Sequence, residues 1–108
     1  MIRSLRSLLV TGIVLIIAAV LTGCGSSTPL DGPEDVMRIY RTSCLSCHGT
    51  ELQGRVGEQT NLQQVGNRLS EEDIRTRIEQ GGDIMPDFKS KLKPEEIEAL
   101  AAWLADKH

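Results

Sequence analysis

The stretch Cys44-Leu45-Ser46-Cys47-His48 decides how the rest of this chain is interpreted. Two thiols three positions apart, followed directly by a histidine, form the pattern typical of covalent haem attachment. Each thiol can add across one vinyl group of the porphyrin to give a thioether, and the imidazole can coordinate the iron from one face. One helical turn would set both sulfur atoms along the same edge of the ring. We therefore expect Cys44 and Cys47 to bind haem c covalently and His48 to be an axial iron ligand.

Three other uses of these cysteines have weaker support. A thioredoxin-like dithiol is expected in a βαβ context, and no strand-like run follows the motif. A zinc site needs four ligands, so Cys44, Cys47 and His48 would have to recruit His108, the last residue of the chain. A disulfide between Cys44 and Cys47 would close a very short loop and stabilise little. Covalent haem attachment remains the favoured interpretation.

The length and composition predict one small domain. The chain has 108 residues, and Tyr40, Phe88 and Trp103 are its only aromatic residues. Without the N-terminal segment about 85 residues remain, near the size at which a protein core alone becomes marginal, so a buried haem would supply the missing bulk. Without Arg3 and Arg6, residues 24–108 hold ten basic and fifteen acidic residues. This acidic balance argues against nucleic acid as a partner.

Residues 1–23 are typical of an export signal. Arg3 and Arg6 give a positive start, and residues 8–21 are an uncharged apolar run of the length expected for a signal peptide. The following Leu21-Thr22-Gly23-Cys24 resembles the lipobox of bacterial lipoproteins, in which the cysteine is acylated and becomes the mature N-terminus. With two thiols on haem, Cys24 is otherwise an odd cysteine in an exported protein. An uncleaved helix over residues 5–21 is the alternative.

Both interpretations of the N-terminus attach the domain to the extracytoplasmic face of the cell membrane. The sequence predicts a lipid-anchored linker over residues 24–32, because it is rich in small residues and turn formers. Residues 33–108 are then the haem domain. The eight residues that follow Cys24 in this linker, residues 25–32, reach no further than about 28 Å when extended, so this domain would work close to the membrane surface.

Within the haem domain the patterning predicts helices separated by irregular segments. One helix is expected from Pro33 into the haem motif, one from the N-cap Ser70 to Gly81 or Gly82, and one from Pro94 to the C-terminus. Residues 49–66 are polar and glycine-rich, which is typical of a loop. In a haem protein this loop would wrap the histidine side of the ring, with Leu52 and Leu62 as contacts.

A second iron ligand is expected opposite His48. It should be soft enough for ferrous iron, lie on a loop and follow the motif at some distance, and Met85 meets these conditions in the segment Asp83-Ile84-Met85-Pro86. His108 is the competing ligand, but it lies at the free end of the last helix. Met37 is expected to be a packing residue.

The chain resembles the small class I cytochromes c, above all the lipid-anchored monohaem cytochromes c of Gram-positive bacteria. Beyond the attachment motif, the matching features are Tyr40, Gly49, Asn61-Leu62, Val65-Gly66, residues 69–74, Ile78, Gly81, Met85-Pro86, Phe88, residues 94–97, Ala99-Leu100 and Trp103-Leu104. The resemblance implies an all-α fold of three or more helices around one haem, with Asn61 among the haem contacts.

Two positions depart from the pattern of that family. Val36 stands where a glycine is common at the crossing of the terminal helices, and Thr60 stands where a proline is common. The carbonyl of that proline accepts a hydrogen bond from the ligand imidazole in the family. Thr60 keeps the carbonyl but lacks the fixed φ.

The resemblance implies a monomeric one-electron carrier, not an enzyme, that passes electrons from a quinol-oxidising membrane complex to a terminal oxidase. With His48 and Met85 both bound, no position on the iron is open for a substrate. The alternative is a c-type haem sensor or a peroxidase-like enzyme in which Met85 is labile. Neither an additional histidine near the motif nor an arginine cluster supports that alternative.

Overall fold

The computed structural model describes residues 30–108 of the chain. The predicted signal peptide and the predicted acylation site Cys24 lie outside the described residues. Within residues 30–108, none of the helices is long and apolar enough to cross a membrane.

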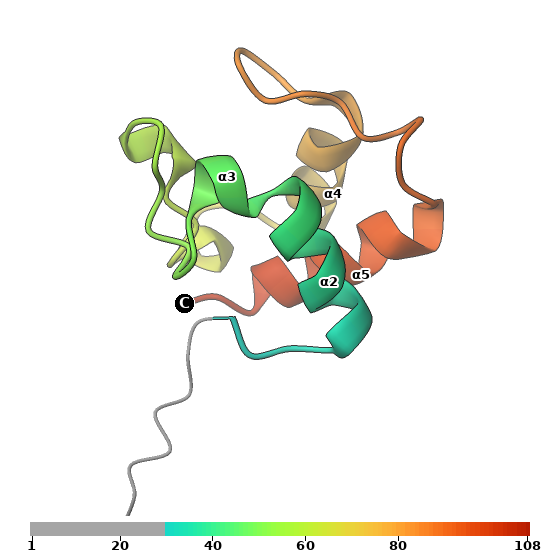
Figure 1. Cartoon of the computed structure of the whole chain (residues 1–108), viewed down its shortest axis with the longest axis horizontal. Coiled ribbons are helices and arrows are strands. Elements are labelled where there is room, and N and C mark those ends of the chain that lie inside the picture. Colours follow the sequence, from blue (N-terminus) through green and yellow to red (C-terminus); the bar gives the residue numbers. More distant parts are fainter. Residues whose placement is uncertain (1–29) are drawn as a thin grey trace, which may run out of the picture.

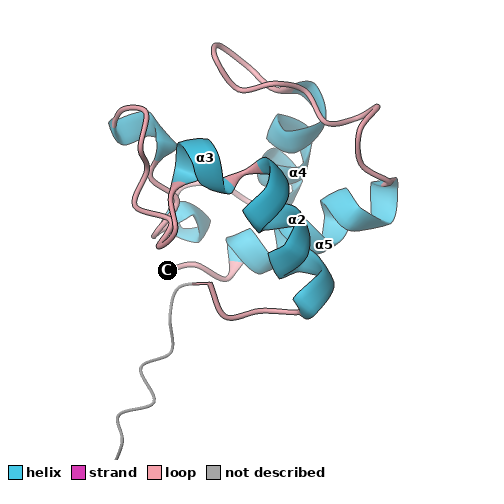
Figure 2. Ribbon diagram, in the orientation of Figure 1, coloured by secondary structure: helices cyan, strands magenta, loops and turns pink. Residues whose placement is uncertain are grey.

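The described part of the chain is helical, as predicted (Figure 2). It contains four α-helices and two short 3₁₀-helices, and no strand between residues 30 and 108. In chain order these are α2 (Glu34–Ser43), α3 (Leu45–His48), η1 (Glu58–Thr60), η2 (Val65–Asn67), α4 (Glu71–Gln80) and α5 (Pro94–Ala105). The predicted loop over residues 49–66 thus contains η1 and the start of η2, whose three-residue length gives no periodic pattern in the sequence.

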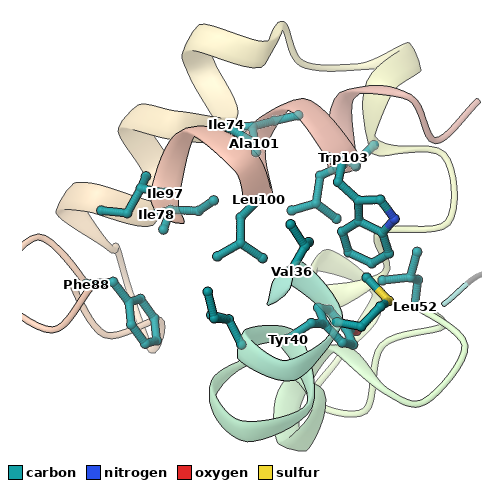
Figure 3. Close-up of a cluster of buried hydrophobic side chains, with 14 residues drawn as sticks. Val36, Tyr40, Leu52, Ile74, Ile78, Phe88, Ile97, Leu100, Ala101 and Trp103 are labelled. Carbon is teal, nitrogen blue, oxygen red and sulfur yellow. The ribbon is translucent and has the colours of Figure 1, made fainter. Parts of the chain in front are cut away.

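Helices α2 and α5 cross, and α4 packs along α5 (Figure 1). Leu100 of α5 points toward Val36 of α2, with Tyr40 and Trp103 at one end of the cluster and Phe88 at the other (Figure 3). Val36 is 1% exposed, so its side chain fills the crossing at the position where the resemblance implies a glycine. Among residues 30–108, the buried hydrophobic core consists of Val36, Met37, Ile39, Tyr40, Leu52, Val65, Ile74, Ile78, Phe88, Ile97, Leu100, Ala101, Trp103 and Leu104. Met37 therefore packs in the core, as predicted.

Trp103 joins the start of the described chain to the core. Its ring meets Tyr40 edge-on, with centroids 5.4 Å apart. Its indole Nε1 donates a hydrogen bond to the carbonyl oxygen of Asp31 at 3.0 Å, and Leu30 packs against the core. A Cβ built on Gly32 would lie 2.6 Å from the same indole nitrogen. The chain is therefore held against the domain from Leu30 onward.

Helix α4 has the N-terminus that the sequence predicts. Ser70 Oγ accepts a hydrogen bond from the backbone N–H of Asp73 at 3.2 Å, and the Asp73 carboxylate accepts from Ser70 N at 3.2 Å and from Ser70 Oγ at 2.6 Å. The hydrogen bonds from Ser70 lower the pKa of Asp73. Gly81, with φ of 67°, ends the helix. This reciprocal capping fixes where α4 begins.

The C-terminal end of α5 is fastened to η2. The backbone N–H of Gly66 donates to the carbonyl oxygen of Lys107 at 2.9 Å, and the exposed His108 ring hydrogen-bonds Asn67 Oδ1 through Nδ1 at 2.9 Å. A Cβ on Gly66 would overlap the carbonyl oxygen of Ala105. The two backbones therefore approach more closely than any residue with a side chain would allow.

Candidate haem-attachment site

The two thiols of the motif lie on the short turn formed by α3. Cys44 precedes the helix, and its carbonyl oxygen accepts hydrogen bonds from the N–H groups of Cys47 at 3.2 Å and His48 at 3.0 Å. Cys44 is half-buried against the core, whereas Cys47 is exposed, and neither forms a disulfide. One turn thus carries both thiols and the imidazole, which is the donor set that a covalently bound haem requires.

Burial changes the acidity of the first thiol. Desolvation, with a smaller contribution from the charge of Cys47, raises the pKa of Cys44 to about 11. The Cys44 thiol is therefore protonated at neutral pH in the protein without haem. A raised pKa is typical of a cysteine packed among apolar groups, whereas the reactive cysteine of a redox dithiol has a lowered pKa.

The imidazole of His48 is oriented by one backbone carbonyl. Its Nδ1 lies 2.8 Å from the carbonyl oxygen of Thr60. Because a carbonyl can only accept, Nδ1 carries the hydrogen and Nε2 keeps its lone pair. Nε2 makes no hydrogen bond within residues 30–108. The ring is thus prepared to bind a metal through Nε2, in the tautomer that ligating histidines adopt. The contact that the sequence left uncertain at Thr60 is present.

The loop after the motif is fastened back onto the motif itself. The phenolic OH of Tyr40 donates to the carbonyl oxygen of Gly49 at 2.7 Å. Gly54 N donates to His48 O and Arg55 N to Cys47 O, each at 2.8 Å. Burial of Tyr40 raises the pKa of its phenol, so this donor stays protonated. These bonds fold residues 49–55 over the end of α3.

Met85 lies in a reverse turn between α4 and α5. The N–H and carbonyl groups of Gly82 and Met85 bond reciprocally, at 3.0 Å and 2.7 Å, with Asp83 and the exposed Ile84 at the tip. Phe88 N then donates to the carbonyl oxygen of Ile78 at 3.0 Å, which ties the segment to α4. Figure 1 shows this segment in orange as an arch from α4 to α5. The half-buried Met85 packs against the core between these two attachments.

The three predicted haem contacts, Leu52, Asn61 and Leu62, lie close together in the structure. Leu52 is fully buried, with φ of 61°, and its carbonyl oxygen accepts a hydrogen bond from Leu62 N at 2.8 Å. Leu62 packs half-buried against the core. The carbonyl oxygen of Asn61 accepts from Arg68 Nη2 at 2.8 Å. The structure brings the three residues together, and their contact with the ring stays a prediction.

The structure disfavours the zinc alternative and the competing histidine. Among the described residues, no three side chains of the histidine, cysteine, aspartate or glutamate type converge to hold a metal ion. His108 is exposed and hydrogen-bonded to Asn67. It is therefore engaged at the end of α5 and does not join the cysteines of the motif.

Comparison with known proteins identifies the family. Residues 31–104 match the family model described as cytochrome c oxidase, cbb3-type, subunit III. The chain is also 31% identical to cytochrome c-551 of Bacillus subtilis (strain 168), over 97% of its own length and 98% of the relative's length. This chain belongs to the cytochrome c family. No solved structure matches the chain at a significant level.

Two further relatives support the assignment of this chain to the cytochrome c family. Cytochrome c-550 of Bacillus subtilis (strain 168) is 35% identical over 62% of the chain and 52% of the relative. Cytochrome c6 of Nostoc sp. (strain PCC 7120 / SAG 25.82 / UTEX 2576) is 30% identical over 97% of the chain and 94% of the relative. As a small class I cytochrome c, the protein carries one covalent haem c and is an electron carrier, not an enzyme. The predicted fold class and cofactor are confirmed.

Some supporting contacts of this cytochrome were not predicted from its sequence. They are the hydroxyl contacts of Tyr40 and Thr60 and the close approach at Gly66. A tyrosine in place of phenylalanine before the motif gives a weak signal that its hydroxyl has a partner. The sequence does not name the partner of Tyr40 or the approach at Gly66, because both join segments that are not adjacent in the chain. The Thr60 hydroxyl bonds to Gly57 within its own turn, but this irregular turn has no periodic pattern that would predict the bond.

Proposed function

We propose that this cytochrome is a one-electron carrier whose haem is attached through Cys44 and Cys47 and whose iron is held between His48 and Met85. The observation that carries the proposal is the hydrogen bond from His48 Nδ1 to the carbonyl oxygen of Thr60, which leaves Nε2 free as a ligand. Met85 is the partner because its turn is anchored on both sides and its side chain reaches the core.

The ligand pair determines the chemistry of the carrier. When bound, the haem supplies a one-electron couple at its iron. His48 and Met85 would occupy both axial positions and leave none for a substrate. The thioether of Met85 favours ferrous iron and thus a high reduction potential. Since both side chains belong to anchored segments, the protein would reorganise little between oxidation states.

Exposure and charge indicate how electrons would enter and leave. Cys47 is exposed and Cys44 half-buried, so a haem attached to them would have that edge near the surface. An acidic protein is steered electrostatically toward a basic partner surface. We propose that the donor is a quinol-oxidising membrane complex, that the acceptor is a terminal oxidase, and that the carrier acts as a monomer.

Absorption spectroscopy of the mature protein tests the proposed ligands. We expect the oxidised form to show the weak far-red charge-transfer band of an iron–methionine bond. We expect the reduced form to resist carbon monoxide at neutral pH, because both axial positions are filled. Rapid binding of carbon monoxide would instead favour the sensor or peroxidase-like alternative with a labile Met85. A colourless protein with free thiols would contradict haem attachment altogether.

We also propose that the domain is tethered to the outer face of the cell membrane through an acyl group on Cys24. Because the chain is held against the domain from Leu30 onward, only residues 24–29 separate the lipid from the first packed residue. Six residues span at most roughly 20 Å. The carrier would therefore stay close to membrane-bound partners and diffuse along the surface.

Replacing Cys24 with serine should abolish the anchor. We expect Cys24→Ser to release the protein from the membrane fraction or to block its maturation, because serine cannot form the thioether that carries the lipid. Ser26→Ala is the matched control and should leave the membrane fraction unchanged. The measurement is haem stain in membrane and soluble fractions, with the mass of the mature protein. Unaltered membrane association of Cys24→Ser would favour an uncleaved helix over residues 5–21.

A further inference from the structure

Thr60 is the one buried polar residue among residues 30–108, with 6% of its surface exposed. It lies at the end of η1, and its side chain bonds only to its own loop. The hydroxyl donates to the carbonyl oxygen of Gly57 at 2.7 Å and accepts from the backbone N–H of Val56 at 3.2 Å. The hydroxyl thus acts as donor and as acceptor within this one turn. The same turn ends at the Thr60 carbonyl, which accepts the hydrogen bond from His48.

The surroundings of Thr60 leave that turn little freedom. A Cβ built on Gly54 would lie 2.7 Å from Thr60 Oγ1 and 2.9 Å from the carbonyl carbon of Thr60. Gly54 has φ of 78° and donates its own N–H to the carbonyl oxygen of His48 at 2.8 Å. The turn at residues 56–60 therefore packs directly on the backbone that follows the motif, with the Thr60 side chain between them.

We propose that Thr60 is a positioning residue for the iron ligand: its hydroxyl locks the turn at residues 56–60 so that its carbonyl holds the His48 ring in one orientation. This inference rests on the proposed ligation by His48. A proline at this position would restrict the backbone through its fixed φ. Thr60 supplies the restraint through two side-chain hydrogen bonds instead. It also keeps a backbone N–H, which donates to the carbonyl oxygen of Gly57 at 3.1 Å.

The restraint has a consequence for the reduction potential. A hydrogen bond at Nδ1 makes an imidazole a more basic ligand through Nε2. A more basic ligand stabilises ferric over ferrous iron and lowers the potential. If the carbonyl of Thr60 were free to move away, the hydrogen bond would weaken and the potential would rise. The Thr60 hydroxyl would thus affect the reduction potential indirectly, because it fixes the turn whose carbonyl holds the His48 imidazole.

The pair Thr60→Val and Thr60→Ser tests the proposal on the haem-loaded protein. Valine keeps the shape of threonine without the hydroxyl, and serine keeps the hydroxyl without the methyl group. We expect Thr60→Val to raise the reduction potential. We also expect exchange of the His48 Nδ1 proton, followed by NMR in the reduced protein, to be faster by roughly tenfold, the effect of losing about one hydrogen bond's restraint. Thr60→Ser should match the unsubstituted protein in both measurements.

Two results would overturn the proposal. The first is a Thr60→Val protein that loses stability while its potential and its His48 proton exchange stay unchanged, since the hydroxyl would then be structural only. The second is read in the unsubstituted protein and needs no variant to fold. The Thr60 hydroxyl proton should exchange slowly enough to be seen by NMR, and exchange at the rate of an exposed hydroxyl contradicts the lock.

The same spectra separate this proposal from the proposed function. In the reduced unsubstituted protein, the ring protons of His48 should show the strong upfield shifts of a ligand lying over a porphyrin. Absence of those shifts would mean that His48 is not the ligand, and the proposed function would fail. Their presence with an insensitive potential in Thr60→Val would contradict the positioning role alone.

Discussion

Replacing Met85 with alanine is expected to leave the haem attached and to lower the reduction potential by on the order of 0.1 V or more, within the roughly 0.8 V over which axial ligands set haem potentials. Alanine removes the thioether but neither cysteine of the motif. Loss of a soft sulfur ligand disfavours ferrous iron. An open axial position should also let carbon monoxide bind the reduced protein rapidly.

The structure indicates that this substitution acts locally. The turn of Met85 is closed by backbone hydrogen bonds with Gly82, which do not require the methionine side chain. Phe88 anchors the segment to α4 through its own backbone and its buried ring. The backbone at residue 85 should thus stay in place when the side chain is shortened.

Met37→Leu is the matched control for Met85→Ala. Met37 is 3% exposed in the core and is not a predicted ligand. Exchange of methionine for leucine conserves volume and costs less than about 1.5 kcal/mol. The potential and the far-red band should be unchanged in this variant, as measured by redox titration and absorption. An unaltered potential in Met85→Ala, or a lowered one in Met37→Leu, would refute the ligand assignment.

Gly66→Ala is expected to lower the free energy of unfolding by about 3 kcal/mol, at the upper end of the usual cost of overpacking. The added methyl group would overlap the carbonyl oxygen of Ala105 and lie 2.9 Å from that of Lys107. Both are backbone atoms at the end of α5, so no side-chain rotation can relieve the overlap. The hydrogen bond from Gly66 N to Lys107 O would also be stretched.

Asn67→Ala provides the comparison for Gly66→Ala within the same 3₁₀-helix. It removes only the exposed hydrogen bond to His108, and it should change stability by no more than about 0.5 kcal/mol. Denaturant unfolding of the haem-loaded proteins, followed by absorption and circular dichroism, gives both values. Equal stability of the two variants would show that the end of α5 can move away from η2 without cost.

Three helical regions and several of their ends could be predicted from local sequence, but the break between α2 and α3 and the two 3₁₀-helices could not. The reciprocal capping of Ser70 and Asp73 is encoded in four consecutive residues, and Gly81 is the residue type that ends a helix with positive φ. Val36, Ile39 and Tyr40 mark the buried face of α2 because helical period repeats every three to four residues. These patterns predict helices from the sequence because the interacting residues lie within one or two helical turns of each other.

The residues that would bind the haem could also be predicted from the sequence, whereas most of the hydrogen bonds that hold them in place could not. The five-residue motif places two thiols and an imidazole on one turn and thereby predicts haem attachment. Met85 was predicted as the second iron ligand because a soft donor is needed there. The hydrogen bond from His48 to Thr60 spans twelve residues, and that from Trp103 to Asp31 spans seventy-two. A backbone carbonyl carries no sequence signal, since every residue has one.

The sequence by itself determined the helices, the attachment motif, the proposed ligands and the family. The family resemblance pointed to the Thr60 carbonyl as the acceptor for His48, but only the tertiary structure showed that this hydrogen bond forms, how the Thr60 hydroxyl fixes the turn, and where the end of α5 meets η2. The physical reason is that side-chain periodicity and capping act between near neighbours. Close backbone approaches such as the one at Gly66 arise only when distant segments pack against one core.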